Sequence, residues 1–99
     1  MVLRVDKIAV DNPRPAHTQF NVSFLIQNDG PDEAAFVLHI QMWGSNGSHA
    51  LDLHEQIPAI EAGLLFGAAF GVPPLEPGIY DVSLTLPDGS GKGDTIHVQ

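Results

Sequence analysis

The stretch that decides the fold is Pro77-Gly78-Ile79-Tyr80-Asp81-Val82-Ser83-Leu84-Thr85-Leu86. From its tyrosine onward, every second residue is large and apolar, in the order Tyr80, Val82, Leu84 and Leu86. A period of two indicates a strand with one buried face and one solvated face. The Pro-Gly pair at its start and the Asp88-Gly89 pair after it predict turns at both ends.

Strand patterns of the same kind recur along the chain. They cover residues 2–10, 18–27, 35–43, 50–57, 64–72 and 95–98, and turn signals separate them. No segment carries the complete apolar stripe of an amphipathic helix. The sequence therefore predicts one domain over residues 1–99, an all-β, seven-stranded immunoglobulin-like sandwich of two antiparallel sheets.

Three details refine this prediction. The alternation slips by one residue near Asp6-Lys7, which predicts a β-bulge. Residues 58–63 are expected to form a connection, and the glycine-rich residues 88–93 a flexible loop before the last strand. Residues 64–72 are expected to belong to the four-stranded sheet of the sandwich.

Composition excludes several kinds of partner. Four basic and twelve acidic residues give a net charge of −8, which argues against binding to nucleic acid or to an anionic membrane. There is no cysteine, so disulfides, thiol chemistry and cysteine-zinc sites are excluded. The longest apolar run is too short to span a bilayer, so we expect no membrane insertion. No signal peptide is visible at the start of the chain.

One family resemblance covers nearly the whole chain. Gln27-Asn28-Asp29-Gly30, Ile60-Glu61-Ala62-Gly63 and Pro77-Gly78-Ile79-Tyr80-Asp81-Val82 are similar to motifs of CARDB, a cell-adhesion-related domain of bacteria and archaea. The resemblance implies an immunoglobulin-like sandwich, an adhesion-type role and a location at the cell surface or outside the cell. In such a fold, Tyr80 occupies the tyrosine corner, where its hydroxyl returns to nearby backbone.

Polar residues give little sign of catalysis. Asp29, Asp32 and Glu33 share one loop, but no second carboxylate is placed opposite them as glycoside hydrolysis requires. His49, Asp52 and His54 have a spacing that can hold a metal ion, and they also fit an ordinary solvated strand face. The sequence predicts no catalytic residue, no cofactor and no metal site.

The best candidates for binding are apolar or small residues that the alternation places on solvated faces. The first group is Val37, His39, Gln41 and Trp43 on one strand. Trp43 can stack on a sugar ring or anchor a protein, and a covering loop explains it equally well. The second group is Leu65, Gly67 and Ala69, on an uncharged strand that either is covered within its own domain or invites pairing with another chain.

These features favour a non-enzymatic protein-interaction or adhesion-type module that binds a protein partner or itself. One alternative is a carbohydrate-binding module that uses Trp43, His39 and Gln41. Another is a structural subunit of a virion or a filament-like assembly. Enzyme activity is not expected.

Overall fold

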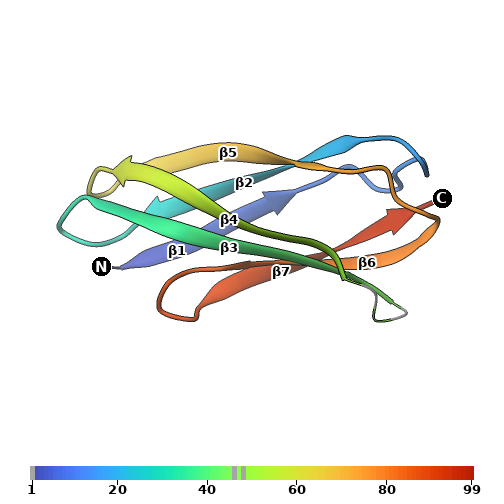
Figure 1. Ribbon diagram of the computed structural model, residues 1–99. Coiled ribbons are helices and arrows are strands. Elements are labelled where there is room, and N and C mark those ends of the chain that lie inside the picture. The colour runs from blue at the N-terminus through green and yellow to red at the C-terminus, as the bar shows by residue number, and fades with distance from the viewer. Residues whose placement is uncertain (1, 46, 48) are drawn as a thin grey trace.

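The computed structural model describes residues 2–45, 47 and 49–99. These residues form seven strands arranged in two layers (Figure 1). The strands are β1 (Leu3–Ala9), β2 (Phe20–Asn28), β3 (Ala34–Gly44), β4 (His49–Ile60), β5 (Leu65–Val72), β6 (Gly78–Thr85) and β7 (Gly91–Val98). Within the described residues, no helix is long and apolar enough to cross a membrane.

The two layers are antiparallel sheets of unequal size. Strands β1-β2-β5 form a three-stranded sheet, called sheet A here, and β4-β3-β6-β7 form a four-stranded sheet, called sheet B. The strand alternation explains this packing, because each strand offers one apolar face to the interior. The predicted fold class, an all-β sandwich of two antiparallel sheets, is confirmed.

The core lies between the two sheets and is built from alternate strand residues. Its fully buried side chains, all less than 2% exposed, include Val22, Ile26, Leu38, Ile40, Met42, Val72, Val82, Leu84 and Ile96. Residues 77–86 contribute four buried side chains, Tyr80, Val82, Leu84 and Leu86. The predicted bulge is also present, since the register of β1 against β2 shifts between Val5 and Lys7.

The prediction for residues 64–72 was wrong about the sheet. Strand β5 pairs with β2 in sheet A along its whole length, from Leu65 opposite Gln27 to Val72 opposite Phe20. The reason is that β4 remains hydrogen-bonded to β3, the strand that precedes it. The chain then turns at residues 61–64 and crosses to the other sheet.

Strands β4 and β7 are each four residues longer than predicted. Strand β7 begins at Gly91, so part of the expected loop 88–93 is strand, with Gly91 opposite Thr85 and Gly93 opposite Ser83. Glycine is needed there because a Cβ at position 91 would overlap the carbonyl group of Leu84. Strand β4 continues through Pro58 to Ile60, which is tolerated because β4 is an edge strand and its register against β3 shifts at this point.

One buried polar residue organises the end of the sandwich where β2 meets β3. Asn28 is 1% exposed, and its Nδ2 donates to the carbonyl oxygens of Ile60 at 2.8 Å and Asp32 at 2.9 Å. Its Oδ1 accepts a bond from the backbone N–H of Gly30 at 3.0 Å. In this chain, the Asn-x-Gly motif that resembles CARDB therefore has a structural role, because the Asn28 side chain connects the turn after β2 to the end of β4.

Candidate functional site

The two groups of candidate binding residues lie on opposite outer faces of the sandwich. Leu65, Gly67 and Ala69 lie on β5 and face outward from sheet A, where all three are exposed. The group on β3 faces outward from sheet B. The structure therefore gives two separate surfaces rather than one site.

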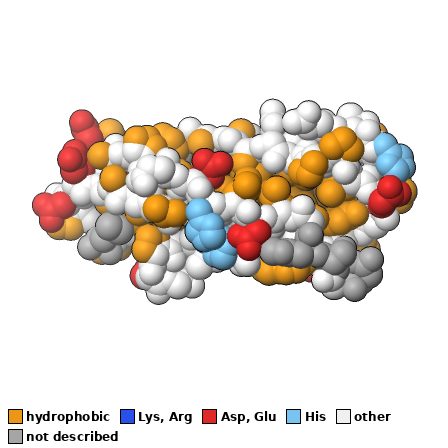
Figure 2. All heavy atoms as spheres, in the orientation of Figure 1, with side chains coloured by type: hydrophobic (Ala, Val, Ile, Leu, Met, Phe, Trp, Pro, Cys, Tyr) orange, Lys and Arg blue, Asp and Glu red, His pale blue; other side chains and the backbone are white. Residues whose placement is uncertain are grey.

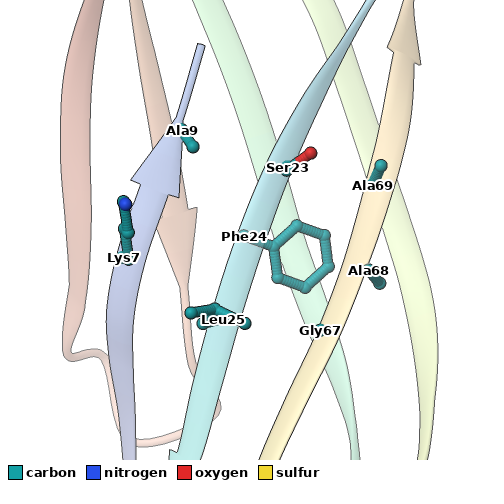
Figure 3. A pocket seen from close by; sticks show the side chains of 8 residues that line it. All are labelled: Lys7, Ala9, Ser23, Phe24, Leu25, Gly67, Ala68 and Ala69. Carbon is teal, nitrogen blue, oxygen red and sulfur yellow. The ribbon is translucent and has the colours of Figure 1, made fainter.

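The outer face of sheet A contains a shallow groove of about 480 Å³ between β1, β2 and β5 (Figure 3). Small side chains of Ala9, Ser23 and Ala69 line it, and Lys7 supplies the one charged group of its lining. Gly67 also lines the groove. The side chain of Leu25 on β2 lies close to it, so that a Cβ added at position 67 would be 3.1 Å from Leu25 Cδ2. Small residues on β5 thus make room for the longer side chains of β2.

The sandwich has four strand edges, and three of them are protected against pairing with another chain. The edge at β1 carries Arg4 and Lys7 and is interrupted by a bulge. The edge at β7 carries Lys92. Arg14, which precedes β2 in the chain, pairs with the end of this strand. The backbone N–H of Arg14 donates to the carbonyl oxygen of His97 at 2.7 Å, and its carbonyl oxygen accepts from the N–H of Gln99 at 2.9 Å. Charges, bulges and covering segments are the usual means by which proteins block edges.

The edge at β4 is the third protected edge, and the edge at β5 is the unprotected one. Strand β4 carries Asp52, Glu55 and Pro58, and its pairing with β3 contains two register shifts. Strand β5 carries no charge, no proline and no bulge over its eight residues. Among the described residues, no strand pairs with its outer side. Hydrophobic side chains extend along the length of the molecule in Figure 2, and no Lys or Arg is visible in that view.

The outer face of sheet B carries the other group. Val37 is 44% exposed, while His39, Gln41 and Trp43 are partly buried. Trp43 lies opposite Asp81 of β6 and is absent from the buried core, so it belongs to the outer layer of this sheet. Whether it binds a partner stays a prediction.

A cluster of three polar side chains lies on this same face. His39 is directly opposite His54, with ring centroids 4.2 Å apart and ring planes within 11° of parallel. His39 Nε2 lies 2.7 Å from Asp52 Oδ1. The sequence pointed to Asp52 and His54 but left His39 on a separate strand, and the side chain of His49 lies outside the described residues. The Asn46-Gly47 pair in the sequence favours a tight hairpin, and a two-residue loop at that pair would place residue 39 opposite residue 54.

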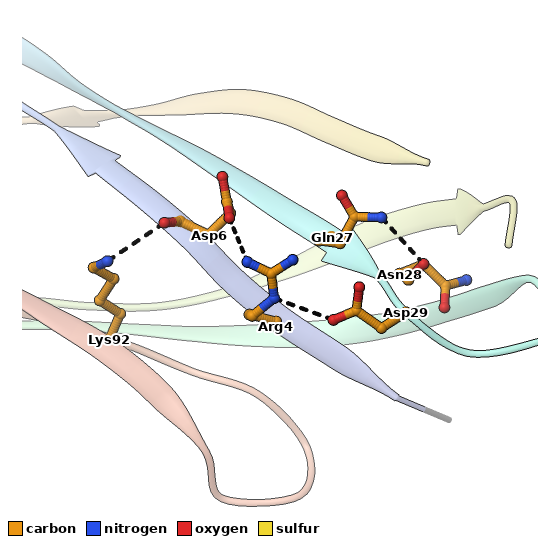
Figure 4. Close-up of polar contacts among 6 residues, drawn as sticks. All are labelled: Arg4, Asp6, Gln27, Asn28, Asp29 and Lys92. Carbon is orange, nitrogen blue, oxygen red and sulfur yellow. Dashed lines mark hydrogen bonds and ion pairs between the residues drawn. The ribbon is translucent and has the colours of Figure 1, made fainter. Parts of the chain in front are cut away.

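The cationic residues lie away from this cluster. Arg4 of β1 forms ion pairs with Asp6 and with Asp29, whose Oδ2 lies 3.1 Å from Arg4 Nε (Figure 4). The hydrogen bond to Asp29 and the charge of this carboxylate raise the pKa of Arg4 above its ordinary value. Lys92 Nζ donates to the backbone oxygen of Asp6 at 3.4 Å, so it joins the β7 edge to the β1 edge.

Comparisons by sequence do not place the chain in a family. No protein-family model matches it, and no curated protein matches it in sequence. Solved structures do match, and they show the fold. A β-glucosidase involved in saponin metabolism from intestinal bacteria matches 99% of this chain with a TM-score of 0.78 at 12% identity. The alkylpurine DNA glycosylase AlkC of Pseudomonas fluorescens, bound to DNA, matches 98% of it with a TM-score of 0.71 at 14% identity.

The chain spans only 16% of the glucosidase and 30% of the glycosylase, so each likeness concerns one part of a larger protein. A third match has nearly the same size as this chain. The CARDB domain of a Pyrococcus furiosus protein, in complex with di-metal ions, is covered to 92% and covers 98% of this chain, with a TM-score of 0.69 at 12% identity. The chain thus has the sandwich fold of a CARDB domain.

Proposed function

We propose that this chain is a non-enzymatic, CARDB-like interaction module that associates with a second copy of itself through strand β5. The observation that carries the proposal is the unprotected edge of β5, the only one of the four described edges without charge, proline, bulge or covering segment. Edge strands of this kind are templates for pairing with another strand. Pairing between copies is also a contact that suits the adhesion-type role implied by the resemblance.

The strand is a suitable partner for itself. In an antiparallel pair, residues directly opposite each other project to the same face of the sheet. Two copies of β5 centred on Ala68 would therefore place Leu65 opposite Gly71 and Gly67 opposite Ala69 on the outer face. Phe66 would lie opposite Phe70 on the inner face, so Leu65, Phe66 and Phe70 would each meet either a glycine or a matching ring. Two sheets A would then continue as one six-stranded sheet around a two-fold axis.

Charge limits the strength of this association. Each copy carries a net charge of −8, and identical copies repel each other. One eight-residue edge also buries less than the roughly 800 Å² per partner of a standard interface. We therefore expect a weak dimer that becomes tighter as salt screens the repulsion. A basic partner protein would show the opposite dependence on salt.

The test is analytical ultracentrifugation of the wild-type chain and two matched lysine variants, at low and high salt. Ala69→Lys adds a charge to the β5 edge, and the two added ammonium groups would be diagonal neighbours across the dimer. Val37→Lys adds the same charge to an exposed position on sheet B. We expect a concentration-dependent dimer for the wild type and for Val37→Lys, and a monomer for Ala69→Lys.

Three outcomes would contradict the proposal. The wild type could stay a monomer at millimolar concentration, or both lysine variants could dimerise equally well. Alternatively, a glycan could bind at Trp43 of a monomeric protein, which would favour a carbohydrate-binding module. Circular dichroism of each variant confirms that it is folded before its association is interpreted.

A further inference from the structure

The cluster of His39, Asp52 and His54 is suited to hold a metal ion. The three residues come from two neighbouring strands of sheet B. His39 on β3 faces His54 on β4, and Asp52 precedes His54 by two residues, so it projects from the same face of β4. Each offers one donor atom, and the three donor atoms lie within 4.8 Å of one another.

The spacing matches what a tetrahedral ion requires. Zinc bonds to histidine nitrogen at about 2.0–2.1 Å and to carboxylate oxygen at about 2.0–2.2 Å, which places neighbouring ligand atoms about 3.4 Å apart. In the cluster, His39 Nε2 and Asp52 Oδ1 are 2.7 Å apart, and all three donor atoms lie within 4.8 Å of one another, so small side-chain movements bring them to this spacing. The two parallel rings must tilt toward each other to share an ion. Both are on an outer sheet face, and His54 is exposed.

The proton on His39 Nε2 must move when the ion binds. An ionised carboxylate only accepts hydrogen bonds, so the 2.7 Å contact requires a proton on His39 Nε2. For a metal ion to take the place of this proton between the same two atoms, His39 must adopt its other tautomer: Nδ1 gains a proton from solvent as Nε2 loses one, so the ring stays neutral. The carboxylate of Asp52 then changes from hydrogen-bond acceptor to ligand without changing its partner.

The surrounding charge favours a cation. Strands β3, β4 and β6 contain no lysine or arginine, and the chain as a whole is acidic. Lys92 lies on β7, at the opposite edge of sheet B from β4.

We propose that His39, Asp52 and His54 form a surface site for one Zn²⁺ ion, with water as the fourth ligand. Two imidazole nitrogens and one carboxylate are a donor set that zinc prefers. Bound there, the ion joins the edge strand β4 to β3 and stabilises the folded state over the unfolded chain. This site lies on sheet B, so its failure would leave the proposal for β5 in sheet A untouched.

The test uses protein stripped with a chelator and titrated with zinc chloride alone, followed by isothermal calorimetry. We expect one ion per chain. His39→Gln, His54→Gln and Asp52→Asn should each weaken binding by about tenfold or more, because even residues behind the ligands of a metal site contribute that much. His97→Gln is the matched control, since His97 is exposed on β7 and outside the cluster.

Imidazole resonances give a second readout that does not depend on variant stability. In the wild-type protein, zinc should shift the NMR signals of His39 and His54 and leave those of His97 unchanged. The proposal is overturned if binding does not saturate at one ion per chain, or if His97→Gln weakens binding as much as His54→Gln. An ion shared between two chains, seen as one zinc per dimer, would also overturn it.

Discussion

The hydroxyl of Tyr80 donates a hydrogen bond to the backbone carbonyl oxygen of Glu76 at 2.9 Å, across the Pro-Gly turn that starts β6. This is the tyrosine corner predicted from the sequence. Tyr80 is 9% exposed and forms part of the core, so the bond connects the turn to the interior.

Tyr80→Phe should lower the free energy of unfolding by about 1 kcal/mol, because it removes this one hydrogen bond and keeps the ring. For a domain of this size that corresponds to about 4–8 °C in melting temperature. Thermal denaturation followed by circular dichroism measures the change. Ile79→Ala is the control, because Ile79 is 47% exposed and its loss should change stability by less than about 0.5 kcal/mol. Equal melting temperatures for Tyr80→Phe and wild type would contradict a structural role for the corner.

Local alternation predicted which residues are buried because a pleated strand admits only two faces. Phe20, Val22, Phe24 and Ile26 are all buried on β2, as their spacing indicated. Sheet membership was harder to predict, because the pattern of β5 is the same whichever strand it pairs with. Its place in sheet A depends on β4 keeping β3 as its neighbour, which is a choice between partners distant in sequence.

Clusters that cross strands were also missed for a physical reason. The sequence showed that His39 and His54 point outward, but their contact depends on the register of the β3–β4 pair. The glycines at 91 and 93 were assigned to a loop from their conformational freedom. They lie in β7 because that strand approaches β6 too closely for a Cβ at position 91.

Asn28→Asp should destabilise the protein by about 3 kcal/mol at neutral pH. The substitution keeps the shape but replaces an amide that donates to two carbonyl oxygens with a buried carboxylate that repels them. Burial favours the neutral form of the introduced acid, so stability should recover in part as the pH falls and the acid becomes protonated. Urea denaturation at several pH values measures this dependence. The same substitution at exposed Asn21 is the control. An equal loss of stability in both variants would contradict the structural role of the Asn28 hydrogen bonds.

Ser90→Ala should raise the pKa of Asp88 toward its ordinary value. The Ser90 hydroxyl, 2.6 Å from Asp88 Oδ1, is the largest cause of the lowered pKa, and the Ser90 backbone N–H at 2.9 Å adds to it. Because the pKa of Asp88 is lower in the folded state than in the unfolded chain, the ionised carboxylate stabilises the turn at pH values above the pKa of the unfolded chain. This stabilisation is lost as the pH falls through the pKa of the folded state. NMR titration of the Asp88 carboxyl group measures the shift. An unchanged titration in Ser90→Ala would show that the hydroxyl contributes nothing.

Trp43→Ala should cost about 1–2 kcal/mol, less than the roughly 3–5 kcal/mol expected for removing a fully buried aromatic ring. Trp43 is partly buried on the outer face of sheet B, whereas Phe36 is 5% exposed in the core and provides the comparison as Phe36→Ala. If copies associate through β5, Trp43→Ala should leave the dimer intact, because the two sites lie on different sheets. Loss of association in this variant would indicate that the interface lies on sheet B instead of at β5.

Gly67 and Leu25 should show energetic coupling in a double-mutant cycle. In the wild type, the methyl group of an alanine at position 67 would lie 3.1 Å from Leu25 Cδ2, so the leucine must move. The cost of this movement offsets the stability that Gly67→Ala gains by restricting the unfolded chain. In a Leu25→Ala background this obstacle is absent, and Gly67→Ala should stabilise the protein by about 0.4–1 kcal/mol. Urea denaturation of the four proteins gives the coupling energy, which we expect to exceed about 0.5 kcal/mol. Additive effects would mean that Leu25 yields its position at no cost, and that the small residues of β5 are not required by the packing of β2.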